Sequence, residues 1–193
     1  MRLILASGSP RRRQILKGLG LAFEVRVPHV DEVFDPNRSP EEGAVTNALL
    51  KAREIAREVS DAVVLGADTI VVLGDVIFTK PSDDRDAVRM LDALSGQRHR
   101  VITGYACIAV GDNGIAEEIT GFEVSWVTMR RLSGEEIERY VQEHSPMDKA
   151  GSYAIQEIGE RFIECIEGDY DNVVGLPGIR IRGILDDLSA RFG

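Results

Sequence analysis

Cysteine and histidine are scarce in this chain of 193 residues, which has two cysteines and three histidines. Cys107 and Cys165 lie far apart and form no Cys-x-x-Cys pair, so we expect two reduced, buried thiols, as in a cytoplasmic protein. His29, His99 and His144 are scattered along the chain. Without the close His and Cys spacing that holds zinc, the sequence argues against a zinc site.

Long hydrophobic runs are absent too. No stretch approaches the roughly 18 apolar residues of a membrane span. The first residues lack the basic-then-apolar order of a signal peptide, because the arginines follow the apolar residues. We therefore expect a cytoplasmic protein without a membrane partner. At 44% hydrophobic residues the chain can bury one substantial core, and we expect a single domain over residues 1–193.

Positive charge is in deficit, since 23 Lys and Arg face 32 Asp and Glu and the formal net charge is −9. A broad nucleic-acid-binding surface needs a basic face, so this balance argues against a nucleic-acid partner. It leaves room for a small anionic ligand. An acidic protein can bind a triphosphate by concentrating a few Arg and Lys side chains locally and recruiting Mg²⁺ with carboxylates.

The most informative segment is Leu3–Arg13. Its first three residues are apolar and predict a short buried strand, and Ser7–Ser9 predict a tight turn. Ser9 is a favourable N-cap and Pro10 suits the first position of a helix. A helix start presents unpaired N–H groups, and Arg11–Arg13 add guanidinium groups suited to phosphate. The segment predicts an anion-binding site, although a capped helix with a solvated basic first turn would show the same residues.

Hydrophobic periodicity predicts interspersed strands and helices. Glu41–Ser60 has the apolar spacing of a helix, and Ala62–Leu73 is a β-branched run typical of a central strand. His99–Val110 and Glu117–Met129, joined by Gly111–Gly114, predict a long antiparallel hairpin. The other predicted elements are strands at Ala22–Val27 and Arg161–Glu167 and helices at Pro10–Leu19, Ser82–Gly96, Ser133–Glu143 and 181–192. Together they predict a single-domain α/β sandwich around a mixed twisted sheet.

Asp68 stands inside the most hydrophobic segment of the chain. A carboxylate there is costly unless a metal, a cation or backbone donors compensate it, so we favour a functional role over a strand-end aspartate bonded to a turn. Three other candidates are Asp31-Glu32, Lys80 and the small, polar segment Lys149–Gln156; each alone is more typical of solvated surface or an ordinary connector. The P-loop and GxGxxG signatures of nucleotide-binding proteins are absent.

Taken together, these segments resemble the Maf family of nucleoside triphosphate pyrophosphatases, whose motifs occur here in order along essentially the whole chain. The matching segments are Leu5–Arg12, Asp31-Glu32, Lys51-Ala52, Gly66–Thr69, Lys80-Pro81, Met90–Gly96, His99 with Thr103-Gly104, Asp148–Tyr153 and Asn172–Pro177. The resemblance implies a Maf- and ITPase-like fold. It also implies hydrolysis of a nucleoside triphosphate between the α and β phosphates, with Mg²⁺ or Mn²⁺ as the divalent metal.

Thr69 and Gln156 resemble the branch of the family that acts on dTTP and UTP, including modified pyrimidine triphosphates, and clears unwanted nucleotides. By the same resemblance, Asp68 is the catalytic residue and binds the metal together with Glu32. The implied substrate-binding residues are Ser7, Ser9, Arg11, Arg12, Lys51, Thr69, Lys80 and Gln156. A homodimer is implied as well. The alternative is a non-catalytic regulator of cell division, in keeping with the family's older association with septum formation.

Overall fold

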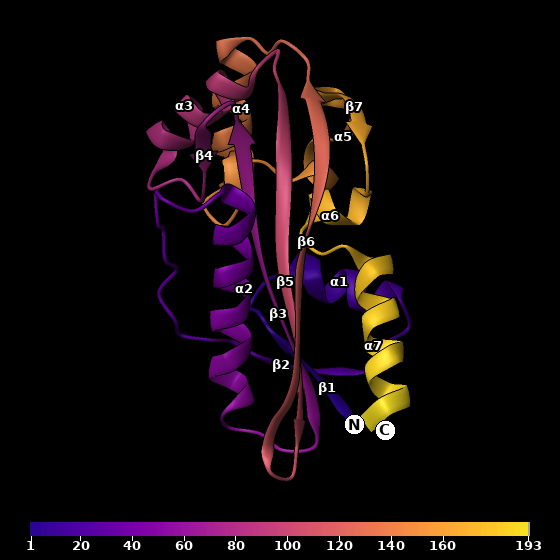
Figure 1. Ribbon diagram of the computed structural model, residues 1–193. Coiled ribbons are helices and arrows are strands. Elements are labelled where there is room, and N and C mark those ends of the chain that lie inside the picture. Colours follow the sequence, from indigo (N-terminus) through magenta and orange to yellow (C-terminus); the bar gives the residue numbers. More distant parts are fainter. Residues whose placement is uncertain (193) are drawn as a thin grey trace. The chain divides into compact units, whose positions relative to one another are not determined.

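The computed structural model describes residues 1–192 and, at 159 and 160, the backbone only. Its strands form one mixed sheet in the order β2-β1-β3-β5-β6-β7, with β4 paired to β3 (Figure 1). The strands are β1 (Arg2–Ala6), β2 (Phe23–Arg26), β3 (Ala62–Leu73), β4 (Val76–Phe78), β5 (Arg98–Gly111), β6 (Gly114–Met129) and β7 (Ile163–Glu167). The helices are α1 (Pro10–Gly18), α2 (Pro40–Ala56), α3 (Asp84–Leu94), α4 (Gly134–His144), α5 (Ile155–Phe162), α6 (Tyr170–Val174) and α7 (Gly178–Phe192), with a 3₁₀ turn, η1 (Ala150–Ser152).

The predicted α/β fold with a mixed sheet is confirmed. Strand β1 runs parallel to both β2 and β3, whereas the β3–β4 and β6–β7 pairs are antiparallel. The predicted long hairpin is present as β5 and β6, which are neighbours in the sheet. None of the described helices is both long and apolar enough to cross a membrane.

The chain divides into two compact units, and three strands run through both. The first unit comprises residues 1–68, 103–123 and the chain from 175 onward; the second comprises residues 69–102 and 124–174. The expectation of one domain over residues 1–193 stays a prediction.

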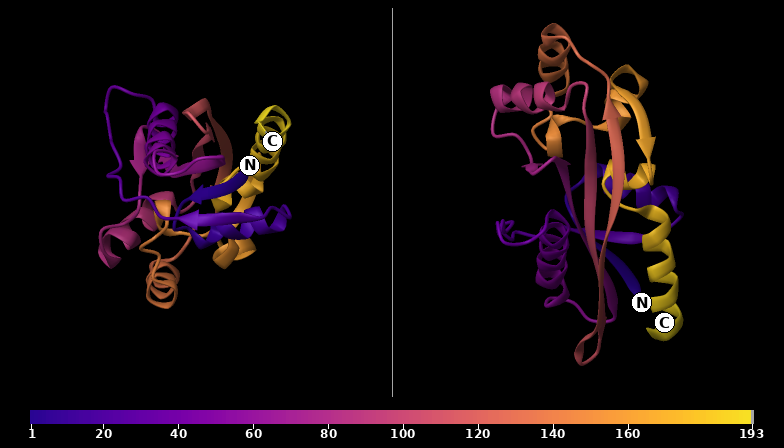
Figure 2. Two further views of the ribbon diagram at one scale, coloured as in Figure 1. Left: turned by 90° about the horizontal axis from the view of Figure 1, so that it is seen from below. Right: turned by 45° about the horizontal axis from the view of Figure 1, so that its top comes forward.

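In the first unit, α2 and α7 lie on opposite sides of the strands (Figures 1 and 2). Every second residue of β1, β3 and β5 points toward α2, as the alternation of strand side chains requires. The resulting cluster contains Ile4, Ala6, Ala48, Ala52, Ile55, Ala56, Ala62, Val64, Ala106, Ile108 and Val110. Its many alanines indicate that helix and sheet approach each other closely.

Two glycines on the sheet make this close approach possible. A Cβ atom on Gly66 would overlap the carbonyl oxygen of Ala48 and lie 2.9 Å from the backbone nitrogen of Ala52. A Cβ atom on Gly104 would overlap the backbone of Ala44 and Val45. Because helix backbone rather than a flexible side chain fills both places, any larger residue would push α2 away from the sheet.

Helix α2 begins one residue before the predicted Glu41 and ends four residues before the predicted Ser60. Its start is fixed by a capping box, in which Ser39 Oγ accepts from the Glu42 amide and Glu42 Oε2 accepts from the Ser39 amide. It ends early because the chain turns at Asp61, whose φ is 47°, to enter β3.

Helix α1 is held at both ends by the C-terminal part of the first unit. Near its start, Arg12 Nε donates to the carbonyl oxygen of Gly175 over 2.8 Å. At its end, Arg182 Nη1 of α7 donates to the carbonyl oxygen of Leu19 over 2.6 Å. Gly20 follows with φ of 70°, the left-handed conformation that suits glycine after a helix.

The second unit departs from the sequence prediction in several elements. The segment Lys149–Gln156 is not a simple connector, because it contains η1 and the start of α5. Helix α5 includes Arg161 and Phe162, so β7 begins at Ile163 instead of Arg161. Strand β4 and helix α6 were not predicted at all.

Two further expectations need correction. Helix α3 begins at Asp84 and not at the predicted Ser82, because Asp83 is its N-cap: Asp83 Oδ1 accepts the Asp86 amide hydrogen, while the Ser82 amide donates to Asp86 Oδ2. Of the two free cysteines, Cys107 is buried as expected and Cys165 is exposed. Burial raises the pKa of the Cys107 thiol to about 12, which keeps it protonated and inert.

Candidate active site

The turn from β1 into α1 is built around three side chains of the first unit. Ser9 caps the helix by accepting from the Arg12 amide over 3.4 Å. Ser7 is buried and its Oγ accepts from the Ser9 amide over 3.2 Å and from Arg12 Nη1 over 3.1 Å. The predicted strand, tight turn and capped helix are therefore all present, with no acidic residue in the first turn of α1.

Arg12 and Arg13 also donate hydrogen bonds to groups of the chain itself. Arg12 donates to Gly175 and to Ser7, and Arg13 Nη2 donates to the carbonyl oxygen of Gly8 over 2.9 Å. Phosphate contacts by Arg11 and Arg12 stay predictions. Arg12 also has a structural role, because its hydrogen bonds connect the turn Ser7–Ser9 to the backbone at Gly175.

Glu32, Lys51 and Asp68 converge in the first unit, although they come from a loop, a helix and a strand. Lys51 Nζ lies 2.8 Å from Glu32 Oε1 and 2.6 Å from Asp68 Oδ1. The side chain of Asp68 is 7% exposed and that of Glu32 41% exposed. The ammonium group thus joins a buried carboxylate to one that reaches solvent.

Burial and charged neighbours shift the pKa values of Asp68 and Arg12 in this cluster. Burial raises the pKa of Asp68, Glu32 raises it further, and Lys51 and Arg12 lower it. Burial lowers the pKa of Arg12, and the carboxylates of Asp68 and Glu32 oppose that effect. A carboxylate with a raised pKa is a better proton acceptor than an ordinary aspartate, and this suits a general base.

The donor set of this cluster fits a divalent cation of the magnesium type. Two carboxylates already point at one shared positive group, and Mg²⁺ is usually held by one or two carboxylates together with water and substrate phosphates. Within residues 1–192, no group of three or more His, Cys, Asp or Glu side chains is arranged to hold a metal. A metal at Glu32 and Asp68 would therefore depend on the substrate for further oxygen ligands.

The remaining predicted residues belong to the second unit. Thr69 follows Asp68 in β3 and is half-buried, whereas Lys80 and Gln156 are exposed. The segments that carry Lys80 and Gln156 are linked by a hydrogen bond from the Gly151 amide to the carbonyl oxygen of Thr79, over 3.1 Å. Their predicted contacts with substrate stay predictions.

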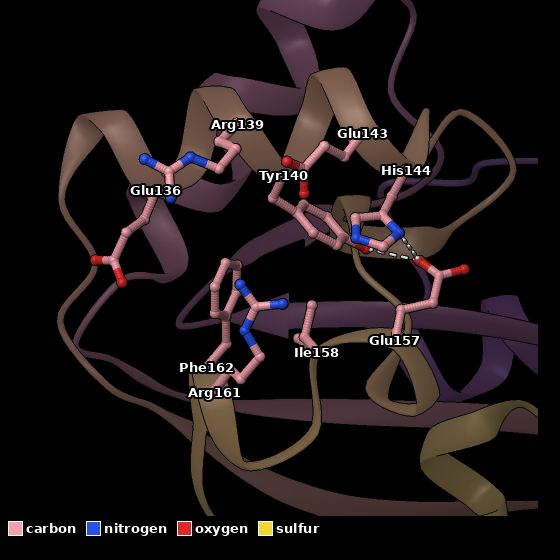
Figure 3. Close-up of a pocket in the computed structure, with 9 residues that line it drawn as sticks. All are labelled: Glu136, Arg139, Tyr140, Glu143, His144, Glu157, Ile158, Arg161 and Phe162. Atoms are coloured by element: carbon pink, nitrogen blue, oxygen red, sulfur yellow. Dashed lines mark hydrogen bonds and ion pairs between the residues drawn. The ribbon is translucent and has the colours of Figure 1, made fainter.

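The start of α5, which carries Gln156, is fixed by its neighbour Glu157. Figure 3 shows Glu157 beside Tyr140 and His144 in a pocket between α4 and α5. Tyr140 Oη donates to Glu157 Oε2 over 3.1 Å, and the Tyr140 and His144 rings stack with centroids 4.8 Å apart. Buried Lys149 Nζ lies 3.3 Å from Glu157 Oε1. These contacts hold the backbone at Gln156 in place.

A buried pair supports the same segment from within the second unit. His99 Nε2 and Tyr153 Oη are 2.7 Å apart, and both side chains are buried. Burial lowers the pKa of His99 to about 4, so the ring is neutral at physiological pH. Both residues lie in segments that resemble Maf motifs, and their contact was not predicted.

Two other contacts were not predicted from the sequence. Asn47 of α2 contacts the loop that carries Glu32, and Gly175 accepts the bond from Arg12. The signal for Asn47 was present, since it precedes Lys51 by one helical turn and so lies on the same helix face. Nothing in the local sequence marks Gly175 as a partner of residue 12.

Comparison with known proteins adds three findings. The family model described as Maf-like protein matches residues 2–188. A dTTP/UTP pyrophosphatase of Dictyoglomus turgidum is 44% identical over 192 residues, covering 99% of this chain and 96% of that protein. A dTTP/UTP pyrophosphatase of Alkaliphilus oremlandii is 46% identical over 184 residues, covering 95% and 94%.

Solved structures show the same fold at low sequence identity. A HAM1 protein from Coxiella burnetii superposes with a TM-score of 0.53 at 16% identity, covering 97% of this chain and 99% of that chain. The Ham1 protein of Staphylococcus aureus gives a TM-score of 0.52 at 13% identity, with the same coverage. At these identities the likeness concerns the fold alone.

Proposed function

This chain belongs to the Maf family, and we propose that it hydrolyses dTTP and UTP to the nucleoside monophosphate and pyrophosphate. The observation that carries the proposal is the convergence of Glu32, Lys51 and Asp68 in the same unit as the Ser7–Arg12 turn. A buried carboxylate, a carboxylate open to solvent and a set of cations are the groups that hydrolysis of a phosphoanhydride requires.

The triphosphate is held by the helix start and by a set of cations. The first backbone N–H groups of α1 and its dipole favour anions, and Arg11 supplies a guanidinium group there. Ser7 and Ser9 shape the turn, and Arg12 fixes it to Gly175. Lys51 and Lys80 are the other phosphate ligands in this proposal.

Cleavage of the α–β bond follows in-line attack of water on the α phosphorus, with pyrophosphate as the leaving group. Asp68 accepts the proton of the attacking water, helped by the pKa that burial raises. Glu32 and Asp68 would hold a Mg²⁺ or Mn²⁺ ion, which supplies positive charge to offset the charge that develops on the phosphate oxygens. Lys51 then turns from the carboxylates to the phosphates. The carboxylates and the phosphate oxygens are then each offset by positive charge.

The pyrimidine base is selected by its polar edge. The amide of Gln156, together with backbone groups that fix the pattern, offers a donor and an acceptor that match O4 and N3–H of uracil and thymine. Cytosine reverses these groups and would leave buried polar atoms unpaired. In the cell, such an enzyme would act in the cytoplasm, as a homodimer, and keep unwanted or modified pyrimidine nucleotides out of nucleic acid synthesis.

The proposal is tested by measuring pyrophosphate release from dTTP, UTP, dCTP, dATP and GTP in the presence of Mg²⁺. We expect pyrophosphate as the first product and a preference for dTTP and UTP. Asp68→Asn should lower kcat by about 10²–10⁴-fold, because the proton acceptor is lost. Asp75→Asn, a change at an exposed turn, is the matched control and should keep the wild-type rate.

Each contrary result has a definite meaning. Orthophosphate as the first product would rule out a pyrophosphatase. Wild-type turnover in Asp68→Asn would rule out Asp68 as the catalytic residue. Nucleotide binding without any turnover would favour the non-catalytic regulator instead.

A further inference from the structure

One face of α2 carries three polar side chains that bind the loop between β2 and α2, drawn beside that helix in Figure 1. Asn47 Oδ1 accepts from the Val33 amide over 2.8 Å. Lys51 Nζ donates to Glu32, and Glu54 Oε2 accepts from the His29 amide over 2.7 Å. Residues 47, 51 and 54 are spaced by four and three, so they share one helix face.

Asn47 differs from the other two because it binds the loop backbone in both directions. Its Oδ1 accepts from the Val33 amide, and its Nδ2 donates to the Val33 carbonyl oxygen over 3.3 Å. The side-chain amide therefore makes the same two hydrogen bonds to Val33 that the backbone of a neighbouring strand would make. Asn47 is 8% exposed, so its partners are shielded from competition with water.

The loop makes little apolar contact at this point. No helix or strand occurs between Arg26 and Pro40, and the residues on either side of position 33 do not enter the core. Val33 is 52% exposed and Phe34 is 68% exposed. Hydrogen bonds, rather than apolar burial, therefore determine where the backbone next to Glu32 lies.

We propose that Asn47 is a positioning residue that sets the place of the Glu32 carboxylate opposite Asp68 and so tunes the affinity of the metal site. The inference rests on the proposed function, in which Glu32 and Asp68 hold the divalent ion. Asn47 itself touches neither metal nor substrate. It acts through the Val33 backbone, one residue beyond Glu32, as groups behind a metal ligand commonly do.

The direct test is the binding of Mn²⁺ to the full chain without nucleotide, measured by electron paramagnetic resonance of the free ion. Asn47→Ala should raise the Mn²⁺ dissociation constant by about tenfold or more, within the range seen for residues that orient metal ligands. Asn47→Ser, which leaves a polar group at the buried position, should act in the same direction and serves if the alanine variant does not fold.

A matched control is Thr46→Ala. Thr46 Oγ1 accepts from Arg38 Nη1 over 2.7 Å and donates to the Glu42 carbonyl oxygen, so it binds the same loop at its other end. Its loss removes loop contacts without touching Val33. The Mn²⁺ dissociation constant of Thr46→Ala should therefore equal that of the wild type.

A double-mutant cycle separates positioning from general stability. Glu32→Gln should weaken Mn²⁺ binding, and adding Asn47→Ala to it should weaken binding little further, because the residue through which Asn47 acts is already lost. Amide hydrogen exchange gives a readout without metal. The Val33 amide should lose protection in Asn47→Ala and keep it in Thr46→Ala.

The outcomes distinguish this inference from the proposed function. Unchanged Mn²⁺ binding in Asn47→Ala, beside weakened binding in Glu32→Gln, overturns the inference and leaves the metal assignment intact. Equal losses from Asn47→Ala in the wild-type and Glu32→Gln backgrounds also overturn it. Unchanged binding in Glu32→Gln overturns the metal assignment, and the inference with it.

Discussion

The Nζ atom of Lys51 lies 2.6 Å from Oδ1 of Asp68, and the same atom lies 2.8 Å from Oε1 of Glu32. One ammonium group therefore occupies the position at which a divalent ion would meet both carboxylates. A lysine can leave such a position by rotating its flexible stem, whereas the carboxylates are held by a strand and a loop. Lys51 and the proposed metal would thus compete for the same oxygens.

Lys51→Met should separate the two tasks of this lysine. Without the competing ammonium, Mn²⁺ should bind the free protein more tightly, because the two carboxylates lose the positive group that they share. The value of kcat/KM for dTTP should nevertheless fall by at least about tenfold, since a proposed phosphate ligand is gone. Metal binding without nucleotide and steady-state kinetics check the two parts. Lys17→Met, at an exposed position of α1, should change neither.

Gly66→Ala should disrupt the contact between Lys51 and Asp68 by displacing α2. The new Cβ would overlap the Ala48 carbonyl oxygen, so α2 must shift and carry Lys51 away from Asp68. We expect a loss of about 1–3 kcal/mol in the free energy of unfolding, the usual cost of overpacking, together with reduced activity. Urea denaturation and pyrophosphate release measure the two effects.

The control for that variant lies in the same helix. Nothing lies within 4 Å of a Cβ built on Gly43 of α2, so Gly43→Ala should be neutral or stabilising by up to about 1 kcal/mol. If Gly66→Ala were as stable and active as Gly43→Ala, the close approach of α2 to β3 would not matter to the site.

Gln156→Ala should reduce discrimination between bases more than turnover. The amide supplies the donor and acceptor predicted to match uracil and thymine, so kcat/KM for dTTP should fall by about tenfold and that for dCTP much less. Side-by-side kinetics on the two substrates give the ratio. An unchanged ratio would mean that another group chooses the base.

The stability of the protein should fall in mild acid because of His99. Its folded-state pKa of about 4 lies below the ordinary value of 6.5, so the unfolded chain takes up a proton first. The contribution is fully present above pH 6.5 and is lost at about 1.4 kcal/mol per pH unit as the pH falls toward 4. Chemical denaturation at pH 7, 6 and 5 measures this slope.

Replacing His99 should flatten that pH dependence. Gln cannot take up a proton in this range, so His99→Gln should show a shallower loss between pH 6.5 and 4, even if it is less stable at pH 7. His29→Gln, at an exposed residue, should retain the wild-type slope. A wild-type slope in His99→Gln would place the titrating group elsewhere.

Elements with a strong periodic pattern were predictable from the sequence. Helix α2, strand β3 and the β5–β6 hairpin each carry enough apolar repeats to define their type, although Ser39 and Asp61 moved the ends of α2. The polar residue inside β3 was equally informative. Asp68 proved to be buried and paired with a cation, as the cost of desolvating a carboxylate requires.

Elements that depend on distant contacts could not be predicted. Helix α5 begins in a run of small and polar residues, and its start is stabilised by Tyr140 and Lys149 acting on Glu157. The two-way bond between Asn47 and Val33 joins residues 14 positions apart. Such pairs leave no local sequence pattern, because the two residues become neighbours only when the chain folds.

The arginine bonds at the two ends of α1 bear on when the protein becomes active during its synthesis. Arg12 and Leu19 are synthesised long before their partners, because the Gly175 carbonyl and the Arg182 side chain that complete these bonds are each 163 positions further along the chain. A nascent chain therefore lacks both anchors of α1 until residues 175 and 182 have been made. Fragments that end before residue 175 should consequently show no pyrophosphatase activity.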